Sequence, residues 1–218
     1  MKKEYIIWDW NGTLFDDVAL CMESINYLLK KEGLPLLVDK DAYQRVFRFP
    51  VIRYYEAVGF DFSKRSFDEL AQDYMAYYQP RSLSQVLYPD AIDVLETFQK
   101  QGYVQVLLSA SKKNYLHAQV KQFPLEGYFK DIVALDDIHA NSKAELARSY
   151  VESQRANMKS VTFIGDSVHD YEVSCYAGGA CILIANGHEH KDKLIATGTR
   201  VVDQLRPMIA IINPAFAS

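Results

Sequence analysis

The chain has 218 residues, of which 49% are hydrophobic and 24% are charged, and its formal net charge is −4. This length suits one well-buried α/β domain, or a core domain with a small accessory one, and the acidic balance argues against non-specific nucleic-acid binding, which needs a basic surface. No apolar stretch is long enough for a membrane span. The apolar run that follows Lys3 stops at Asp9 and is too short for a signal peptide, so we expect a cytoplasmic protein.

The first predicted element is a short buried strand over residues 5–9, which ends at Asp9 and opens into a turn that contains Asn11, Gly12 and Thr13. A carboxylate at the carboxyl end of a parallel strand faces the crevice in which open α/β sheets bind ligands. Because an aspartate can attack phosphorus and form an aspartyl phosphate, Asp9 is a candidate nucleophile.

The next predicted elements are helices. Residues 16–31 carry apolar side chains at the 3.6-residue period, with acids at the start and lysines at the end. Residues 40–79 continue as aromatic-rich helical segments that are broken at Pro50 and closed by Pro80. These helices form an insertion from about residue 17 to 85, directly after the first strand and its turn, where they are able to act as a lid.

Beyond residue 88 the pattern changes to short apolar runs that alternate with helices, which is typical of a parallel sheet with crossover helices. The predicted strands cover residues 103–108, 132–135, 161–165, 181–185 and 200–202, and the predicted helices cover residues 90–101, 111–122, 142–154, 168–177 and 204–212. The sequence therefore predicts an α/β fold with a Rossmann-like, doubly wound parallel sheet.

The sequence holds three cysteines, Cys21, Cys175 and Cys181. Their number is odd, and their spacing is not that of a metal site. Each falls in an apolar pattern that suits a small buried hydrophobic residue, so we expect all three to lie in the core.

Later segments place polar side chains where they suit a phosphate site. Ser109 follows an apolar run, and Lys143 opens a helical pattern. A serine hydroxyl with its N–H, and a lysine ammonium group, both bind phosphoryl oxygens. Simpler roles also fit, because Ser109 can be a turn residue with Ser111 as a rival, and Lys143 has rivals in Lys112 and Lys113.

A further segment is Gly165-Asp166-Ser167, which follows a predicted strand, with Asp170 four residues after Asp166. Carboxylates, a carbonyl and waters form the oxygen site that Mg²⁺ prefers, and no histidine or cysteine cluster with the right spacing competes for a transition metal. An ordinary strand-to-helix turn with an N-cap is the structural alternative. The second acid, together with the distant Asp9 turn, favours the metal site.

Together these segments resemble the four motifs of the haloacid dehalogenase superfamily of phosphotransferases, over essentially the whole chain. The resemblance implies a core domain of residues 1–16 and 86–218 and an α-helical cap of residues 17–85, as in relatives of phosphoglycolate phosphatase and β-phosphoglucomutase. It implies catalytic roles for Asp9, Asn11, Ser109 and Lys143. It implies that Mg²⁺ is bound by Asp9, the main-chain carbonyl of Asn11 and Asp166, with Asp170 as a further ligand or a supporting partner. It also implies substrate binding by Gly12, Thr13, Ser109, Ala110 and Lys143.

Position 11 departs from the pattern of this family. In its phosphatases the residue two positions after the nucleophile is usually a second aspartate, which protonates the leaving alcohol and then activates water. Here it is Asn11, whose amide is able to donate a hydrogen bond to the leaving oxygen but cannot exchange a proton. General acid–base catalysis contributes roughly 10² to 10⁴-fold. We therefore expect slow turnover on alkyl phosphates, activity on substrates with good leaving groups, and a gain in Asn11→Asp.

Specificity is expected to reside in the cap. Three cap arginines, Arg45, Arg48 and Arg53, are candidates for binding the distal part of a substrate, with Arg48 preferred, although an exposed basic patch explains them more simply. His169, next to the metal motif, is expected to point to solvent rather than to move a proton.

The leading interpretation is a Mg²⁺-dependent phosphatase, monomeric or homodimeric, that acts on a small phosphorylated metabolite through an aspartyl phosphate at Asp9, with no nucleic-acid or membrane partner. A first alternative is a catalytically impaired protein that binds a phosphorylated ligand or regulates, because Asn11 replaces the proton carrier. A second alternative is a phosphonate-cleaving hydrolase, whose relatives use a cap lysine as a Schiff base. The cap lysines here are Lys30, Lys31, Lys40 and Lys64, and each also fits a solvated helix charge.

Overall fold

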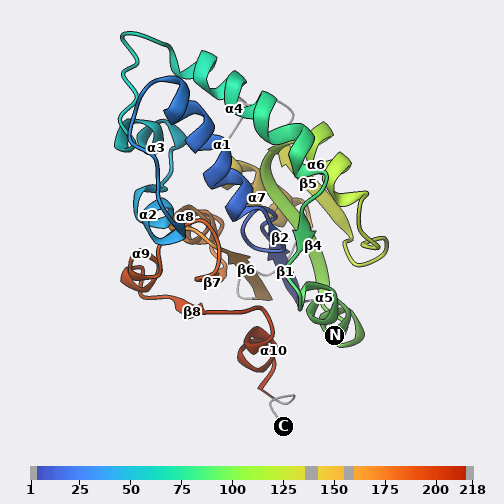
Figure 1. Ribbon diagram of the computed structural model, residues 1–218. Coiled ribbons are helices and arrows are strands. Elements are labelled where there is room, and N and C mark those ends of the chain that lie inside the picture. Colours follow the sequence, from blue (N-terminus) through green and yellow to red (C-terminus); the bar gives the residue numbers. More distant parts are fainter. Residues whose placement is uncertain (1–3, 136–141, 155–159, 215–218) are drawn as a thin grey trace.

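The computed structural model describes residues 4–135, 142–154 and 160–214. At its centre is a six-stranded sheet with the order β5-β4-β1-β6-β7-β8, in which neighbouring strands are parallel (Figure 1). The strands are β1 (Tyr5–Trp8), β4 (Val104–Lys112), β5 (Asp131–Leu135), β6 (Val161–Gly165), β7 (Ala180–Ile184) and β8 (Arg200–Val202). The chain starts in the middle of the sheet, builds one half with β4 and β5, and returns to build the other half from β6. The predicted doubly wound α/β fold is confirmed.

Helices cover both faces of this sheet because its first strand is apolar on both sides. They are α5 (Ala91–Lys100), α6 (Lys113–Val120), α7 (Lys143–Ser153), α8 (Val168–Ala177), α9 (Lys191–Ala196) and α10 (Pro207–Ile212). Ile6 and Trp8 of β1 are buried in one cluster with residues of α5, α6 and α10. Tyr5 and Ile7 of the same strand are buried in another with residues of α7 and α8.

Four further helices lie between β1 and β4 in the sequence and stand together at one end of the sheet (Figure 1). They are α1 (Val18–Lys31), α2 (Lys40–Val46), α3 (Val51–Ala57) and α4 (Phe67–Ser82). Ile25, Leu28 and Leu29 recur at helical spacing on α1 and are buried against aromatic side chains of the other three helices, in a cluster of their own. This separate core supports the division into a sheet domain and a cap of residues 17–85, which we retain as a proposal.

A short ribbon joins the two parts. β2 (Phe15–Asp16) pairs antiparallel with β3 (Val86–Leu87), so the segment that enters the helical insertion lies beside the segment that leaves it. The Tyr88 N–H continues this pairing by donating to the Leu14 carbonyl at 3.0 Å. Neither strand was predicted, because two residues are too few to show a periodic pattern.

Several predicted boundaries were wrong. α4 continues through Pro80 to Ser82, because a proline in the last turn interrupts little of the helix. β4 continues to Lys112 with an irregular register after Ser109, so the next helix begins at Lys113 and not at residue 111. The short helix α9 was not predicted.

The expectation for the cysteines was correct for two of the three. Cys21 and Cys181 are buried, whereas Cys175 is exposed. Cys175 lies in α8, where the 3.6-residue period directs only one side of the helix at the sheet, and its neighbours Ser174 and Ala177 are the buried ones.

The helical insertion is docked on loops at the end of the sheet. Lys40 Nζ donates to the main-chain carbonyl of Asn186 at 2.8 Å and to its side-chain oxygen at 2.7 Å. Gln44 Nε2 donates to the Gly187 carbonyl at 2.7 Å. The ring of Phe49 stacks on the ring of His169, with centroids 4.7 Å apart. His169 therefore packs against the cap and does not simply point to solvent as expected.

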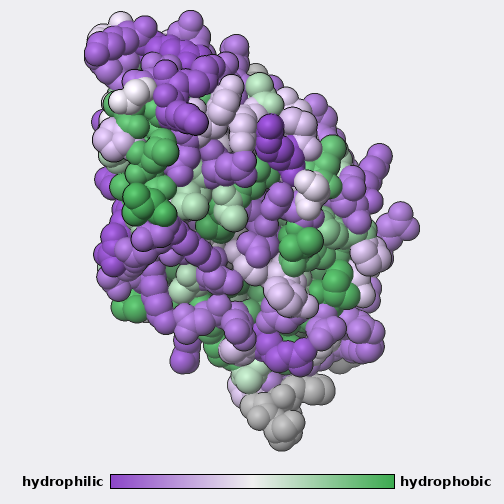
Figure 2. Space-filling model, viewed as in Figure 1, coloured by the Kyte–Doolittle hydropathy of each residue, from purple (hydrophilic) through white to green (hydrophobic). Residues whose placement is uncertain are grey.

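The surface on the side drawn in Figure 2 is mostly hydrophilic, with apolar patches between the charged side chains. Among the exposed apolar side chains of the cap are Phe49, Val51 and Ile52, which precede or begin α3. In the parts of the chain that the structure describes, no helix has the length and apolar character needed to cross a membrane.

Replacement of Ile25 by alanine should destabilise the protein. Ile25 is fully buried in the core of the helical insertion, so its loss removes packed methyl groups and leaves a cavity. We expect Ile25→Ala to lower the free energy of unfolding by about 2–5 kcal/mol, measured by chemical denaturation. Ile195→Ala is the matched control, since this side chain is 54% exposed, and it should change stability by less than about 0.5 kcal/mol. Equal losses in the two variants would contradict the assigned core.

Candidate active site

The candidate site lies at the carboxyl ends of β1 and β6, where the strand order reverses. Open α/β sheets bind ligands at such a point. Asp9 follows β1, and its N–H donates to the Ile164 carbonyl of β6 at 2.8 Å. Asp166 directly follows β6, and Asp170 lies in the first turn of α8. Carboxylate oxygens of Asp9, Asp166 and Asp170 all lie within 4.8 Å of one another, so the structure brings the three predicted acids together.

Two glycines let the surrounding loops approach Asp166 this closely. Gly12 has a φ of 71°, and an added Cβ would lie 2.3 Å from Asp166 Oδ2 and 2.5 Å from Cδ2 of His188. At Gly187 an added Cβ would lie 2.2 Å from the same carboxylate. Both positions are therefore closed to any side chain.

Lys143 connects two of the acids. The hydroxyl of Ser142 accepts the N–H of Glu145 as an N-cap, which sets the start of α7 and places Lys143 at its first position. Lys143 Nζ lies 2.5 Å from Asp9 Oδ1 and 2.6 Å from Asp170 Oδ1, and its side chain is 6% exposed. Burial alone would lower the pKa of this ammonium group, but the two carboxylates raise it above its ordinary value, so Lys143 stays charged.

Asp170 is held at both of its oxygens. Oδ1 binds Lys143, while Oδ2 accepts the N–H groups of Asp166 and Ser167 and the Ser167 hydroxyl, in a capping box that starts α8. Burial raises the Asp170 pKa, but Lys143 and Ser167 outweigh it, and the pKa falls below its ordinary value. These contacts favour a supporting role for Asp170 over direct metal ligation.

The other two acids are poorly neutralised. Burial, and to a lesser degree the neighbouring charge of Asp170, raise the pKa of Asp9 to about 6 although Lys143 opposes them. Burial is also the main reason why the pKa of Asp166 is raised to about 8, with Asp170 and Asp9 adding to it and His188 opposing it. The site holds more negative charge than its cations offset.

This donor set fits Mg²⁺. The candidate ligands are oxygens of Asp9 and Asp166 and the main-chain carbonyl of Asn11, which are the hard ligands that this ion takes. A divalent cation beside Asp9 and Asp166 would also remove the charge imbalance that raises both pKa values.

Asn11 lies beside the acids with both ends of its amide engaged. Its Nδ2 donates to Asp17 Oδ2 at 2.8 Å and to the Tyr78 hydroxyl at 3.0 Å. Its Oδ1 accepts the Ser111 hydroxyl at 3.0 Å. In this conformation both amide hydrogens are directed at the first residues of the cap and at α4 and not at a leaving oxygen.

Two residues that the sequence analysis missed, Asp17 and His188, form a buried ion pair. His188 Nε2 lies 3.2 Å from Asp17 Oδ1, with the side chains 7% and 0% exposed. Burial lowers the pKa of His188, but Asp17 outweighs it and raises the pKa to about 9. The His188 N–H donates to Asp166 Oδ2 at 2.5 Å, and Nδ1 lies 2.8 Å from the Tyr43 hydroxyl. From the sequence, Asp17 could have been noticed only as one of two adjacent acids in Phe15-Asp16-Asp17, and no pattern indicated His188.

Asp17 and His188, with Cys21, are also close enough to hold a metal ion. Their contacts are those of hydrogen bonds, since Cys21 Sγ lies 3.3 Å from Asp17 Oδ2. The Asp17 carboxylate also accepts from Gly12, Asn11 and a tyrosine, which fills its lone pairs without an ion.

Ser109 lies inside β4 and does not end its strand as predicted. It is buried, and its Oγ accepts the Ser111 N–H at 3.1 Å. The register irregularity that follows Ser109 brings Ser111 to Asn11, so the rival serine is the one that contacts another predicted site residue. Ala110, between them, is exposed.

Gly12 and Thr13 shape the turn and have no spare donor for a phosphate in this conformation. The Gly12 N–H donates to Asp17 Oδ1 at 3.1 Å, and the Thr13 N–H donates to the Trp10 carbonyl at 3.2 Å. The Thr13 hydroxyl contacts Asp166 Oδ1 at 3.4 Å. In this conformation both residues support the site, and their role in substrate binding stays a prediction.

The predicted specificity arginines do not reach the acids. Arg48 is exposed, and its Nε donates to the Val46 carbonyl at 3.1 Å. Arg45 and Arg53 pair with acids of their own helices. In the described part of the chain, the hydrogen bonds of all three stay within the cap.

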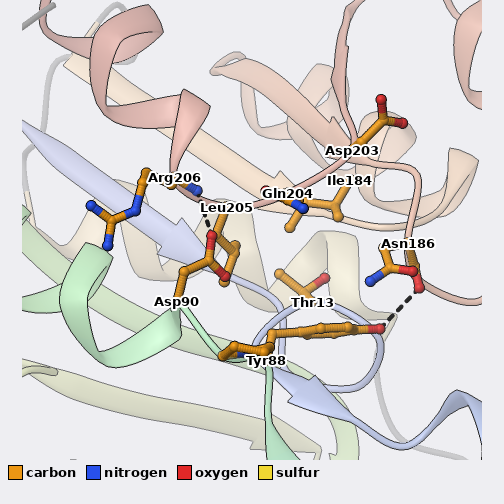
Figure 3. Close-up of a pocket in the computed structure, with 10 residues that line it drawn as sticks. Thr13, Tyr88, Asp90, Ile184, Asn186, Asp203, Gln204, Leu205 and Arg206 are labelled. Carbon is orange, nitrogen blue, oxygen red and sulfur yellow. Dashed lines mark hydrogen bonds between the residues drawn. The ribbon is translucent and has the colours of Figure 1, made fainter.

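A cavity of about 270 Å³ lies next to the site, behind Thr13 (Figure 3). Figure 3 shows Asp90 and Asp203 on opposite sides of it. Arg206 also lines the cavity, but its guanidinium group is paired with a neighbouring aspartate at 2.8 Å. Two carboxylates and a neutralised arginine do not favour a phosphate anion. The buried cation beside Asp9 is instead Lys143.

Comparison with known proteins gives consistent matches. Residues 6–184 match the family model described as haloacid dehalogenase-like hydrolase. The chain is similar to a phosphoglycolate phosphatase of Aliivibrio fischeri, with 21% identity over 96% of each chain. Its structure is similar to a haloacid dehalogenase-like hydrolase of Streptococcus pneumoniae, with a TM-score of 0.82 and 20% identity over 97% of this chain and 99% of that one. A predicted phosphatase of Clostridium acetobutylicum has a TM-score of 0.81, with 19% identity over 97% and 99%.

Without a divalent cation, the protein should lose stability as pH rises from about 4 to 9. Asp9 and Asp166 have folded-state pKa values of about 6 and about 8, above the ordinary 3.8 of an aspartate, and His188 has one of about 9, above the ordinary 6.5 of a histidine. The folded state therefore binds more protons than the unfolded state, so the free energy of unfolding falls with pH, by on the order of a few kcal/mol. Chemical denaturation in chelator at pH 5 and pH 8 measures this fall.

Asp166→Asn should flatten this pH dependence because it removes the acid with the largest shift, and millimolar Mg²⁺ should flatten it in the natural chain. Asp203→Asn, at an acid that is 71% exposed, is the control and should leave the slope unchanged. A free energy of unfolding that rises between pH 5 and pH 8 would overturn the assigned electrostatics.

Proposed function

Because the chain belongs to the haloacid dehalogenase-like hydrolase family, we propose that it is a Mg²⁺-dependent phosphatase that hydrolyses a small phosphorylated metabolite through an aspartyl phosphate on Asp9. The observation that carries this proposal is the convergence of Asp9, Asp166 and Asp170 with Lys143 at the end of β1 and β6. The similarity to a phosphoglycolate phosphatase supports phosphoryl chemistry on a small substrate.

Asp9, Asp166 and the main-chain carbonyl of Asn11 are the residues that would hold Mg²⁺. When bound, the ion supplies positive charge to the phosphoryl oxygens and to Asp9. Lys143 supplies a second positive charge beside Asp9, and Asp170 fixes that ammonium group in place. Phosphoryl transfer depends mainly on such positioning and charge neutralisation.

Asp9 is the proposed nucleophile. An oxygen of Asp9 forms a bond to phosphorus as the bond from phosphorus to the leaving oxygen breaks in line with it. Water then attacks the phosphorus of the aspartyl phosphate, which releases inorganic phosphate and restores the Asp9 carboxylate. Lys143 remains bonded to Asp9 Oδ1 and keeps the carboxylate oriented.

The proton for the leaving group has to come from water. Asn11 cannot carry it, and its amide hydrogens are engaged by Asp17 and Tyr78. The enzyme should therefore act slowly on alkyl phosphates and faster on acyl or aryl phosphates, whose leaving groups need no protonation.

A second candidate follows from the same feature. If turnover is negligible, the protein is a phospho-ligand binding or regulatory protein that keeps the charges of the site but lacks a proton carrier. Phosphonate cleavage, the other alternative, loses support because the cap lysines are engaged elsewhere or exposed. Lys31 pairs with Asp73, Lys64 pairs with Asp61, and Lys40 binds Asn186.

The cap of residues 17–85 would open to admit substrate and close to exclude water. We further propose that the protein acts in the cytoplasm as a monomer or homodimer, without nucleic-acid or membrane partners.

Phosphate release from acetyl phosphate, p-nitrophenyl phosphate and a panel of alkyl phosphates, with and without Mg²⁺, tests this function. We expect Mg²⁺-dependent release that is fastest with acetyl phosphate. Asp9→Asn should abolish it, because the amide cannot attack phosphorus. Tight binding of phosphorylated ligands with no release from any of them would favour the second candidate.

Lys143→Ala should lower kcat by about 10² to 10³-fold, in the range measured when one stabilising donor is lost from a reaction centre. The matched control is Lys113→Ala, since Lys113 is exposed at the start of α6. Equal activity in the two variants would contradict the role of Lys143 as the phosphate-binding cation.

A further inference from the structure

Position 11 is governed by a residue of the cap. We infer that Asp17 is a positioning residue that requires an amide at position 11, fixes the orientation of that amide, and excludes a carboxylate there for as long as it is itself an acid. This inference rests on the proposed function for its kinetic consequence, but its structural part can be tested without activity.

The orientation of Asn11 is set by its neighbours. Nδ2 faces Asp17 Oδ2 at 2.8 Å and the Tyr78 hydroxyl at 3.0 Å, while Oδ1 faces the Ser111 hydroxyl at 3.0 Å. The reversed amide would place its oxygen against the Asp17 carboxylate, where neither group has a hydrogen to donate. Only one of the two amide orientations is therefore satisfied.

Asp17 cannot move away from this contact. It is fully buried, and Oδ1 accepts the Gly12 N–H at 3.1 Å and lies 3.2 Å from His188 Nε2. Oδ2 accepts the Tyr78 hydroxyl at 2.6 Å. Donors from the Asp9 turn, from the loop after β7 and from α4 thus hold the carboxylate on three sides.

An aspartate at position 11 would meet this carboxylate directly. Two ionised carboxylates at the distance of the present Asn11–Asp17 contact repel strongly in a buried site, and a proton taken up to relieve that repulsion is held between the two groups and is not free for a leaving group. The proton carrier that Asn11 lacks therefore cannot be restored by changing position 11 alone. One of positions 11 and 17 can carry a carboxylate only if the other carries a hydrogen-bond donor.

Tyr78 extends the coupling across the cap. Its hydroxyl donates to Asp17, accepts from Asn11 and lies 3.4 Å from Gln119 Nε2 of α6. If α4 moves away, the Asn11 amide loses the Tyr78 hydroxyl, one of its two acceptors. The hydrogen bonds at position 11 thus depend on whether α4 is docked.

A double-mutant cycle tests the inference. The variants are Asn11→Asp, Asp17→Asn and the combination of both, which exchanges the two side-chain types. Asn11→Asp combined with Asp16→Asn is the matched control, since it removes an acid next to Asp17 that makes no hydrogen bond to Asn11 among the described residues.

The first readout is thermal unfolding in chelator, which needs no activity. We expect Asn11→Asp to lower Tm by about 5 °C, the shift that one unsatisfied buried group causes in a chain of this size. The exchange variant should recover at least half of that loss, whereas the Asp16 control should recover none. Should the exchange variant fail to fold, Asn11→Asp with Asp17→Ser replaces it, because serine removes the charge and keeps a small hydrogen-bonding group.

The second readout is kcat and KM on an alkyl phosphate with Mg²⁺. Asn11→Asp alone should show no gain, and the exchange variant should raise kcat by about 10-fold or more with KM little changed, within the range that a general acid supplies. A gain in Asn11→Asp alone with an unchanged Tm, or an exchange variant no better than the Asp16 control, would overturn the inference. If no variant releases phosphate, the proposed function fails, and the unfolding cycle still decides the role of Asp17.

Discussion

The contact of Lys143 with both Asp9 and Asp170 is the interaction on which the rest of the site depends. It places one buried ammonium group between two carboxylates that would otherwise repel each other in an environment with little water. Because Lys143 begins α7 and Asp170 lies in the first turn of α8, the same contact ties two helices on one face of the sheet to the end of β1. The position of Asp9 thus follows from the packing of that face.

The negative charge that Lys143 leaves unbalanced explains which ligands suit the site. Asp9 and Asp166 share the site with too little positive charge, which shows in the raised pKa values of both. A site of this kind gains most from a divalent cation and an anionic substrate that are bound together, because the cation offsets both sets of negative charge. The adjacent cavity that Thr13 lines has a volume of about 270 Å³, but the carboxylates of Asp90 and Asp203 make it a less suitable place for a phosphate.

A second polar network crosses from the sheet to the helical insertion. Asp17 pairs with His188, and tyrosines of the insertion bind both of them, Tyr78 at Asp17 and Tyr43 at His188. Buried polar groups of this kind are stable only when every partner is in place, so the network specifies one docked position of the insertion. Asn11 is part of this network, so its amide is determined by the interface with the insertion as well as by the Asp9 turn.

The sequence by itself determined the fold class, the three aspartates and the lysine. Each of these lies where an apolar strand ends or a helix begins, and the carboxyl ends of parallel strands meet at one edge of a sheet wherever the loops go. It also showed that position 11 lacks an acid. What it could not show is what Asn11 contacts. Asp17, Tyr78 and Ser111 come from separate segments, and Asp17 is itself held by His188 of a fourth, so these side chains meet only when the insertion packs on the sheet. Local pattern fixes which residues stand at the ends of elements, whereas long-range packing decides which of them share a hydrogen bond, and that is why the tertiary structure alone revealed the partner of Asn11.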